Sequence, residues 1–127
     1  MIHGIGTDIV SVPRIEKAMS RYGDRFVRRI LGAAEADECA AASRPAHFLA
    51  KRFAVKEAYS KAFGTGIGAS LSWHDIAVTH DVRGKPCILP SAALAARLKS
   101  LHLSDSHVSL ADEAESSNAF VIIEKES

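Results

Sequence analysis

Several features are scarce in this sequence, and each scarcity narrows the kind of protein that it encodes. Only two cysteines, Cys39 and Cys87, occur in 127 residues, far apart and in no paired motif, which excludes a disulfide framework and a cysteine-based zinc site. No apolar run approaches the roughly 20 residues that a membrane-spanning helix needs. The first ten residues, MIHGIGTDIV, lack the basic segment and long apolar stretch of a secretion signal. We therefore expect a cytoplasmic protein that has no membrane partner.

Aromatic residues and excess charge are also scarce. Aromatics make up 6% of the chain and the net charge is +1, whereas nucleic-acid-binding proteins usually combine a basic excess with stacking aromatic side chains. The six histidines show no H-x-x-x-H spacing, so zinc is unsupported. What remains, 47% hydrophobic and 24% charged residues, is typical of one globular domain. We expect a single domain over residues 1–127.

Helical and strand patterns follow one another in blocks. Helices are predicted from Val12, after Gly23, over 35–42, over 45–63 and from Ser91, and strands over 2–10, 75–80, 86–89, 107–111 and 118–124. The longest helix is expected to end at Gly64, and the glycines of the first strand permit close backbone approach. The grouping of helices and antiparallel strands predicts an α+β fold.

Asp8 is the first residue that the apolar pattern does not explain. It lies inside the predicted strand 2–10, where a carboxylate is costly unless it is paired or binds a metal. A second interpretation stays open, in which Asp8 ends the strand and helps Ser11 to cap the following helix.

Glu57 is the second such residue. Spacing by four places Leu49, Phe53, Glu57 and Lys61 in one row along the long helix. The row begins apolar and becomes charged, which indicates a helix that runs from the core into a site. The alternative is an exposed Glu57–Lys61 pair, which would contribute only about 0.3–0.5 kcal/mol.

Two carboxylates on separate elements would suit Mg²⁺. This ion takes one or two carboxylates together with waters and substrate phosphates, and Lys61 is placed to reach a phosphate oxygen. The loop 64–68 (GTGIG) offers backbone amides to a phosphate. Because it lacks the spacing of a nucleotide-binding loop, it is also consistent with a simple helix terminator.

Basic residues gather in the segment 14–29. Six basic residues stand there against two acidic ones, a local net charge of +4, which leaves −3 for the rest of the chain. Arg14, Lys17 and Arg21 follow at i, i+3 and i+7 and share one helical face. This stripe is suited to docking an acidic helix, and a solvated helix face is the alternative.

These motifs together resemble the holo-acyl-carrier-protein synthase family of phosphopantetheinyl transferases. The matching segments span nearly the whole chain: 4–9 (GIGTDI), 52–58 (RFAVKEA), 61–68 (KAFGTGIG), 84–86 (GKP) and 107–110 (HVSL). The first three are highly specific, whereas GKP and HVSL would be weak alone. Two positions depart from the family pattern, Thr7 and Gly32-Ala33, and the second puts a local helix cap in doubt.

The resemblance implies a fold, a set of partners and a set of site residues. It implies the phosphopantetheinyl transferase fold, with a long helix packed on a small antiparallel sheet, and a homotrimer with active sites between subunits. Asp8 and Glu57 would bind Mg²⁺ and act in catalysis with Lys61. Coenzyme A would contact Arg52, Lys56, Lys61, Gly64, Thr65, Gly66, Lys85, Pro86 and His107. Apo-acyl carrier protein would dock on Arg14, Arg21 and Arg25.

The implied reaction transfers the phosphopantetheine arm of coenzyme A to a serine of the carrier protein and releases adenosine 3′,5′-bisphosphate. Glu57, directly or through a water on the metal, is the first choice for the base, and Asp8 is the second. Two other functions remain as rivals: a Mg²⁺-dependent nucleotide or pyrophosphate hydrolase, and a small nucleic-acid-binding module built on the segment 14–29. No cluster of acids in a short motif supports the hydrolase.

Overall fold

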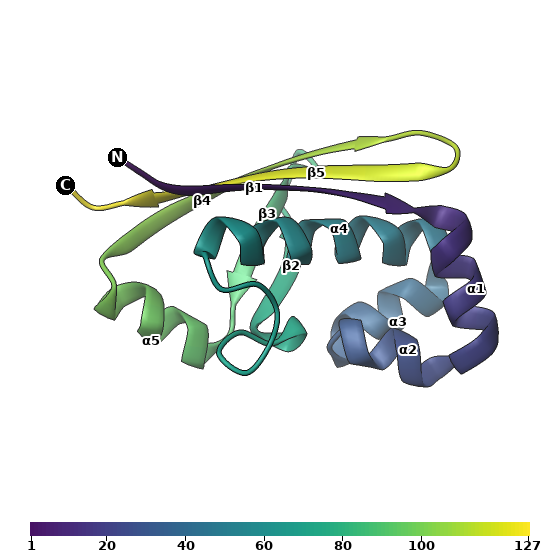
Figure 1. Cartoon of the computed structure of the whole chain (residues 1–127). Helices are drawn as coiled ribbons and strands as arrows, with labels where there is room; N and C mark the ends of the chain where they lie inside the picture. Colours follow the sequence, from purple (N-terminus) through teal and green to yellow (C-terminus); the bar gives the residue numbers. More distant parts are fainter.

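A computed structural model describes the whole chain, residues 1–127, and its elements follow the predicted α+β order (Figure 1). In chain order they are β1 (Ile2–Ser11), α1 (Val12–Tyr22), α2 (Asp24–Ile30), α3 (Ala33–Ala41), α4 (Pro45–Phe63), the short 3₁₀ helix η1 (Trp73–Asp75), β2 (Ile76–His80), β3 (Pro86–Pro90), α5 (Ala92–Ser100), β4 (Leu103–Asp112) and β5 (Ser116–Lys125). The predicted long helix 45–63 is confirmed at both ends, and the two closing strands are longer than predicted. None of the helices is long and apolar enough to cross a membrane.

The central helix α4 lies along a three-stranded antiparallel sheet with the strand order β1-β5-β4 (Figure 1). Helices α1–α3 pack at one end of α4 and α5 at the other, and β2 and β3 form a separate two-stranded sheet. Because α4 has neighbours on several sides, eleven of its 19 residues are buried. The core is one cluster of 25 buried hydrophobic residues, and α4 contributes many of them.

Gly4 and Gly6 let β1 lie directly against α4. A Cβ atom on Gly6 would stand 1.9 Å from the carbonyl oxygen of Ala58, and one on Gly4 would stand 2.0 Å from that of Ala62. Both distances are far below van der Waals contact, so any side chain would push the strand off the helix. The predicted close approach of the backbone is therefore confirmed, and it places Asp8 beside α4.

The structure also shows how helices α1 and α3 begin. The Ser11 hydroxyl accepts a hydrogen bond from the Arg14 amide at 3.4 Å, so Ser11 caps α1 without help from Asp8. Gly32 precedes α3 without any side-chain cap, as its departure from the family pattern suggested. Helix α5 begins after its cap Ser91 as predicted and buries only Leu94, and Leu101 just beyond its end is exposed.

Candidate active site

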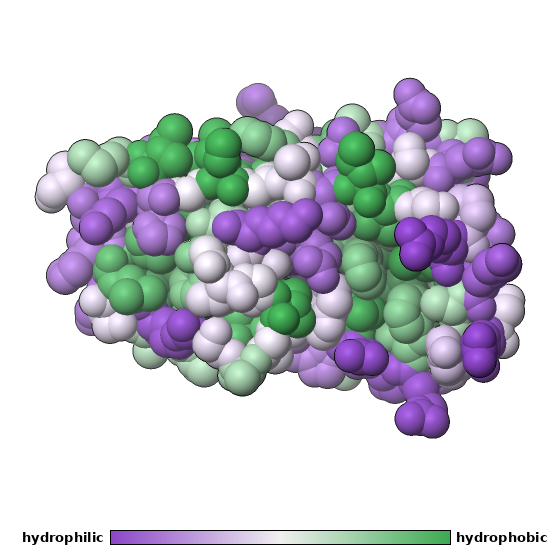
Figure 2. Space-filling view, viewed as in Figure 1, coloured by the Kyte–Doolittle hydropathy of each residue, from purple (hydrophilic) through white to green (hydrophobic).

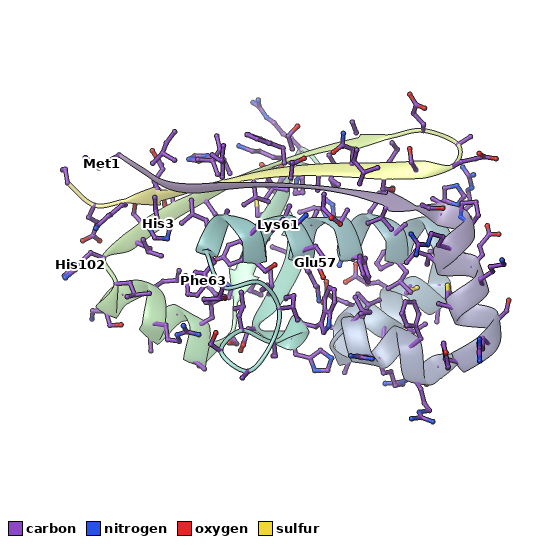
Figure 3. All side chains as sticks on the ribbon, in the orientation of Figure 1. Met1, His3, Glu57, Lys61, Phe63 and His102 are labelled. Atoms are coloured by element: carbon purple, nitrogen blue, oxygen red, sulfur yellow. The ribbon has the colours of Figure 1, made fainter.

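Asp8, Glu57 and Lys61 converge where β1 crosses α4. The Lys61 ammonium donates to the Asp8 carboxylate at 3.1 Å and to the Thr7 carbonyl at 2.9 Å. Burial and the negative charge of Asp8 both raise the pKa of Glu57, against a smaller opposing effect of Lys61. Figure 3 shows Glu57 and Lys61 on α4 beneath β1. Asp8 of β1 and Glu57 of α4 therefore lie close enough for the charge of one to act on the other.

The alternative interpretations of these residues do not hold. Lys61 forms its ion pair with Asp8, so the exposed Glu57–Lys61 pair is absent. Only 18% of the Asp8 side chain is exposed, whereas half of Lys61 is. No hydrogen bond contributes to the pKa of Glu57. Its carboxylate is therefore free to take a proton or a cation.

The composition of this site limits the metals that it suits. No group of three or more His, Cys, Asp or Glu side chains in the chain is arranged to hold a metal ion. Burial and the charge of Asp8 raise the pKa of Glu57. A site of two carboxylates fits a cation that takes its remaining ligands from water and phosphates. The donor set therefore fits Mg²⁺.

The raised pKa of Glu57 makes a prediction for the metal-free protein. Because the folded state holds this pKa above its unfolded value, the charged carboxylate disfavours folding at neutral pH. Glu57→Gln should therefore raise Tm at pH 7.5 by ~2 °C. The gain should vanish below the unfolded pKa, about 4.3, and grow as pH rises through the folded pKa. Thermal unfolding in chelator from pH 4 to 8 checks this, and a Tm difference independent of pH would contradict it.

Lys56 and Arg52 lie inside the protein, where both bond to Glu35. Lys56 is fully buried, and its ammonium donates to Glu35 at 2.7 Å and to the carbonyls of Ile30 at 2.8 Å and Trp73 at 3.2 Å. Arg52 is 4% exposed and donates to the other Glu35 oxygen at 2.8 Å. We call Glu35, Arg52 and Lys56 the Glu35 cluster. Since all three Lys56 protons are used, its expected contact with coenzyme A is corrected to an internal one.

Comparison with known proteins decides the family. A family model described as the 4′-phosphopantetheinyl transferase superfamily matches residues 4–118. The chain belongs to this superfamily. It is 52% identical over 125 residues to the holo-[acyl-carrier-protein] synthase of Aromatoleum aromaticum, covering 98% of this chain and 99% of that protein.

Solved structures of the same transferase superfamily agree over nearly the full length. The crystal structure of holo-[acyl-carrier-protein] synthase from Neisseria meningitidis matches with a TM-score of 0.95 at 44% identity, covering 98% of this chain and 100% of that one. The Helicobacter pylori synthase in complex with coenzyme A matches with a TM-score of 0.83 at 33% identity, covering 94% and 98%. The α+β fold expected from the sequence is confirmed.

The glycine loop of this transferase uses its amides internally. Gly64 adopts the left-handed conformation that ends α4, with φ 109°, and its amide donates to the Ser60 carbonyl. The Gly66 amide donates to the same carbonyl at 3.1 Å, and the Gly68 amide bonds to Leu71 at 2.9 Å. The prediction of free glycine amides for a phosphate is therefore wrong for these three positions, and the helix-terminator interpretation explains them. The Thr65 side chain is exposed and bonds only to the Gly66 carbonyl.

Other expected coenzyme contacts lie apart from Asp8 within one chain. Lys85 and Pro86 lie at the turn of the β2–β3 sheet, which is separate from the sheet of Asp8. His107 lies on β4 with its ring 2.9 Å from the Glu124 carboxylate, and alternation places both on the sheet face that points away from α4. One chain therefore brings together Asp8, Glu57 and Lys61, but not the rest.

The basic stripe of the transferase lies on the surface as predicted. Arg14, Lys17 and Arg21 are exposed along one side of α1. Arg25 is exposed on the neighbouring helix α2. None of the ion pairs of the structure involves any of these four residues, so their charges are available to a partner.

Sequence reasoning missed a second group of basic side chains at the start of α4. Arg44, His47 and Lys51 line a cavity of about 440 Å³ between α4 and the β4–β5 turn. The His47 ring bonds to the Ala114 carbonyl at 3.0 Å, and Lys51 pairs with Asp112 at 3.5 Å. The signal was available, because Arg44, His47 and Lys51 repeat the i, i+3, i+7 spacing of the basic stripe on α1.

Proposed function

We propose that this protein is a holo-acyl-carrier-protein synthase, which transfers phosphopantetheine from coenzyme A to a serine of apo-acyl carrier protein. The observation that carries the proposal is the meeting of Asp8, Glu57 and Lys61, contributed by the two most specific motifs of the chain. Relatives and a solved structure that carry this name match the chain over nearly its full length. We also propose the cytoplasm as its location, where its two free cysteines would stay reduced.

Asp8 and Glu57 are the residues that would hold Mg²⁺. When bound, the ion would neutralise the pyrophosphate of coenzyme A and orient it. Lys61 uses two of its three protons on Asp8 and Thr7, so the third remains for a phosphate oxygen on the exposed side.

The transfer itself requires one proton to move. The serine oxygen forms a bond to the phosphorus that carries pantetheine, the bond to adenosine 3′,5′-bisphosphate breaks, and the hydroxyl proton must leave. Glu57 is the first choice to accept it, because its carboxylate is free of hydrogen bonds and its pKa is raised toward the operating pH. Asp8 is the second choice, since Lys61 already donates to it.

We further propose that the transferase is a homotrimer with active sites between subunits. The outer face of the β1-β5-β4 sheet carries exposed apolar side chains, among them Ile5 at 59%, Ile9 at 71% and Phe120 at 42%. Figure 2 shows apolar side chains along the upper edge of the molecule, where the sheet runs in Figure 1. Such a face is costly to leave in water. Sedimentation at micromolar concentration should give three copies, and a fully active monomer would refute this part.

A seam between subunits would also complete the coenzyme site. The cavity at Arg44, His47 and Lys51 holds two basic side chains, Arg44 and Lys51, beside the acidic Asp112 and Glu113, and coenzyme A carries three phosphate groups. In one chain this cavity is not joined to Asp8, and neither is His107. A neighbouring copy that brings them together would supply the cations that two buried residues, Arg52 and Lys56, do not.

One assay tests the proposed function as a whole. The protein is incubated with apo-acyl carrier protein, coenzyme A and Mg²⁺, and the carrier is weighed by mass spectrometry. A carrier heavier by one phosphopantetheine, formed only when all components are present, is the expected result. Hydrolysis of coenzyme A without modification of the carrier would favour a pyrophosphatase instead.

The basic stripe on α1 should bind the carrier protein and leave coenzyme A binding alone. Reversing Arg14 and Arg21 to Glu should raise KM for the carrier by about 10-fold or more, because attraction to an acidic partner steers and orients the encounter. The difference in KM between the wild type and the reversed variant should shrink as added salt screens the attraction. Steady-state kinetics with each substrate varied in turn gives the measurement.

The matched control for this reversal is Arg83→Glu, which alters an exposed arginine on the β2–β3 turn. It should leave KM for the carrier unchanged. If the Arg14 and Arg21 reversal weakens coenzyme A instead of the carrier, the stripe belongs to the nucleotide site and this assignment is wrong.

A further inference from the structure

The Glu35 cluster joins α4 to four other segments of the chain. Through Lys56 it reaches the end of α2 at Ile30 and the 3₁₀ helix η1 at Trp73. Glu35 itself comes from α3 and also accepts the Val78 amide of β2 at 3.2 Å, while Arg52 donates to the Val78 carbonyl at 3.0 Å. Every charged group of the cluster is therefore held in a fixed direction by at least two partners.

Stability alone does not account for a cluster of this kind. The cost of removing two or three ions from water nearly cancels their attraction, so a buried ion pair contributes little compared with apolar side chains of equal size. Hydrogen bonds to ions are, however, strongly directional. What the cluster does provide is a fixed orientation of α4 about its own axis.

That orientation determines where Glu57 points. Residues of an α-helix advance by about 100° each, so Arg52 and Lys56 share one side of α4. Ala58 and Ala62, whose carbonyls contact β1 at Gly6 and Gly4, share another. Glu57 and Lys61 fall in the sector between them, about 140° from the cluster and about 100° from the β1 contact. The side of α4 that carries Glu57 and Lys61 is thus fixed by the Glu35 cluster on one flank and by the β1 contact on the other.

The link between the cluster and Glu57 is geometric and not electrostatic. The charges that act on the Glu57 carboxylate are those of Asp8 and Lys61, although Lys56 is its neighbour in the chain. Lys56 and Arg52 are not among them, and their two charges are balanced by Glu35 and Glu38.

We infer that the Glu35 cluster is a positioning device that sets Glu57 against Asp8 at the metal site. This rests on the proposed function. Arg52 and Lys56 act as positioning residues: they touch no substrate, and they fix the rotation of α4 against α3, η1 and β2. Loosening them should separate the two carboxylates and weaken cation binding, with the basic stripe left as it is.

Two variants test this inference. The first replaces Glu35, Arg52 and Lys56 together by Met, which removes all three charges without stranding one of them in the core. The second, Glu35→Gln, keeps the shape of the side chain and removes its charge. Each is studied well below its own unfolding temperature. Glu126→Gln, which removes an exposed partner of His102, is the control for loss of an ion pair.

The probe is Mn²⁺ in the presence of coenzyme A, with the free ion measured by electron paramagnetic resonance. We expect the folded triple variant to bind Mn²⁺ at least ~10-fold more weakly and kcat to fall by a similar factor, while KM for the carrier stays within about twofold. Added metal should restore part of kcat. Glu35→Gln should show the same pattern more weakly, and Glu126→Gln should match the wild type.

The outcomes separate this inference from the proposed function. If either folded variant binds Mn²⁺ and turns over like the wild type, the cluster serves stability alone and the inference is wrong. A loss of kcat in the cluster variants that added metal does not restore at all would also overturn the inference. A wild-type protein that binds Mn²⁺ but transfers no phosphopantetheine would count against the function only, whereas a wild type that binds no Mn²⁺ would overturn both.

Discussion

Replacing Glu57 by glutamine should lower kcat for phosphopantetheine transfer by about a thousandfold or more, a loss of about 4 kcal/mol of transition-state stabilisation. The substitution keeps the size of the side chain and removes both its charge and its basicity. It therefore removes one of two metal-binding carboxylates and the first choice for the base in a single change. Mass spectrometry of the carrier protein after timed incubation measures the effect.

Two comparisons sharpen this test. Glu115→Gln changes an exposed glutamate of the β4–β5 turn and should leave turnover unchanged. Asp8→Asn should lower kcat as much as Glu57→Gln does. The double variant should have a kcat only slightly lower still, because the effects of residues that act as a unit are not additive. Near-wild-type turnover of either single variant at saturating Mg²⁺ would remove the metal site from the proposal.

The opposite effects expected for Glu57→Gln are themselves informative. Without metal the variant should be more stable at neutral pH, since it no longer holds a half-buried charge near Asp8. With substrates it should be inactive. A residue that costs stability and is needed for activity is what a functional carboxylate should look like.

The sequence predicted Asp8 and Glu57 because each breaks a local rule. A carboxylate in an apolar strand and a charged end to an apolar helical row both conflict with burial, and such conflicts mark functional sites. The ends of α4 were also predictable, since proline favours the first turn of a helix and Gly64 adopts a conformation that few other residues tolerate.

Lys56 could not be placed by the same reasoning. In the motif KEA, Lys56 and Glu57 are neighbours, and the sequence does not say which of them faces the interior. The deciding partner, Glu35, lies 21 residues away, and two further partners are backbone carbonyls. Local patterns carry no information about such contacts, because they depend on how α2, α3 and η1 pack around α4.

The prediction of free amides in the glycine loop failed for a different reason. Glycine is favoured both where a phosphate approaches the backbone and where a helix must end, so composition alone left both interpretations open. The Gly64 and Gly66 amides both donate to the Ser60 carbonyl, so at these two positions the loop ends the helix. Only the hydrogen-bond partners of each amide, and not the residue type, distinguish a binding loop from a terminator.

Gly6→Ala should be the most damaging single substitution in the fold. The new methyl group would stand 1.9 Å from the Ala58 carbonyl oxygen and 2.8 Å from the Ala62 amide nitrogen. Both are backbone atoms inside α4, so neither can rotate away, and β1 must lift from the helix. We expect a loss of about 3 kcal/mol or more in the free energy of unfolding, measured by urea denaturation.

The same shift should also disable whatever protein remains folded. Asp8 lies two residues beyond Gly6 on β1, so lifting the strand moves its carboxylate away from Glu57 and breaks the 3.1 Å contact with Lys61. Activity per folded molecule should therefore fall as well. Gly68→Ala is the matched control, because a Cβ there meets nothing within 4 Å and its φ is not positive. A Gly6→Ala protein with the stability and turnover of the Gly68→Ala control would show that β1 does not position Asp8 by contact with α4.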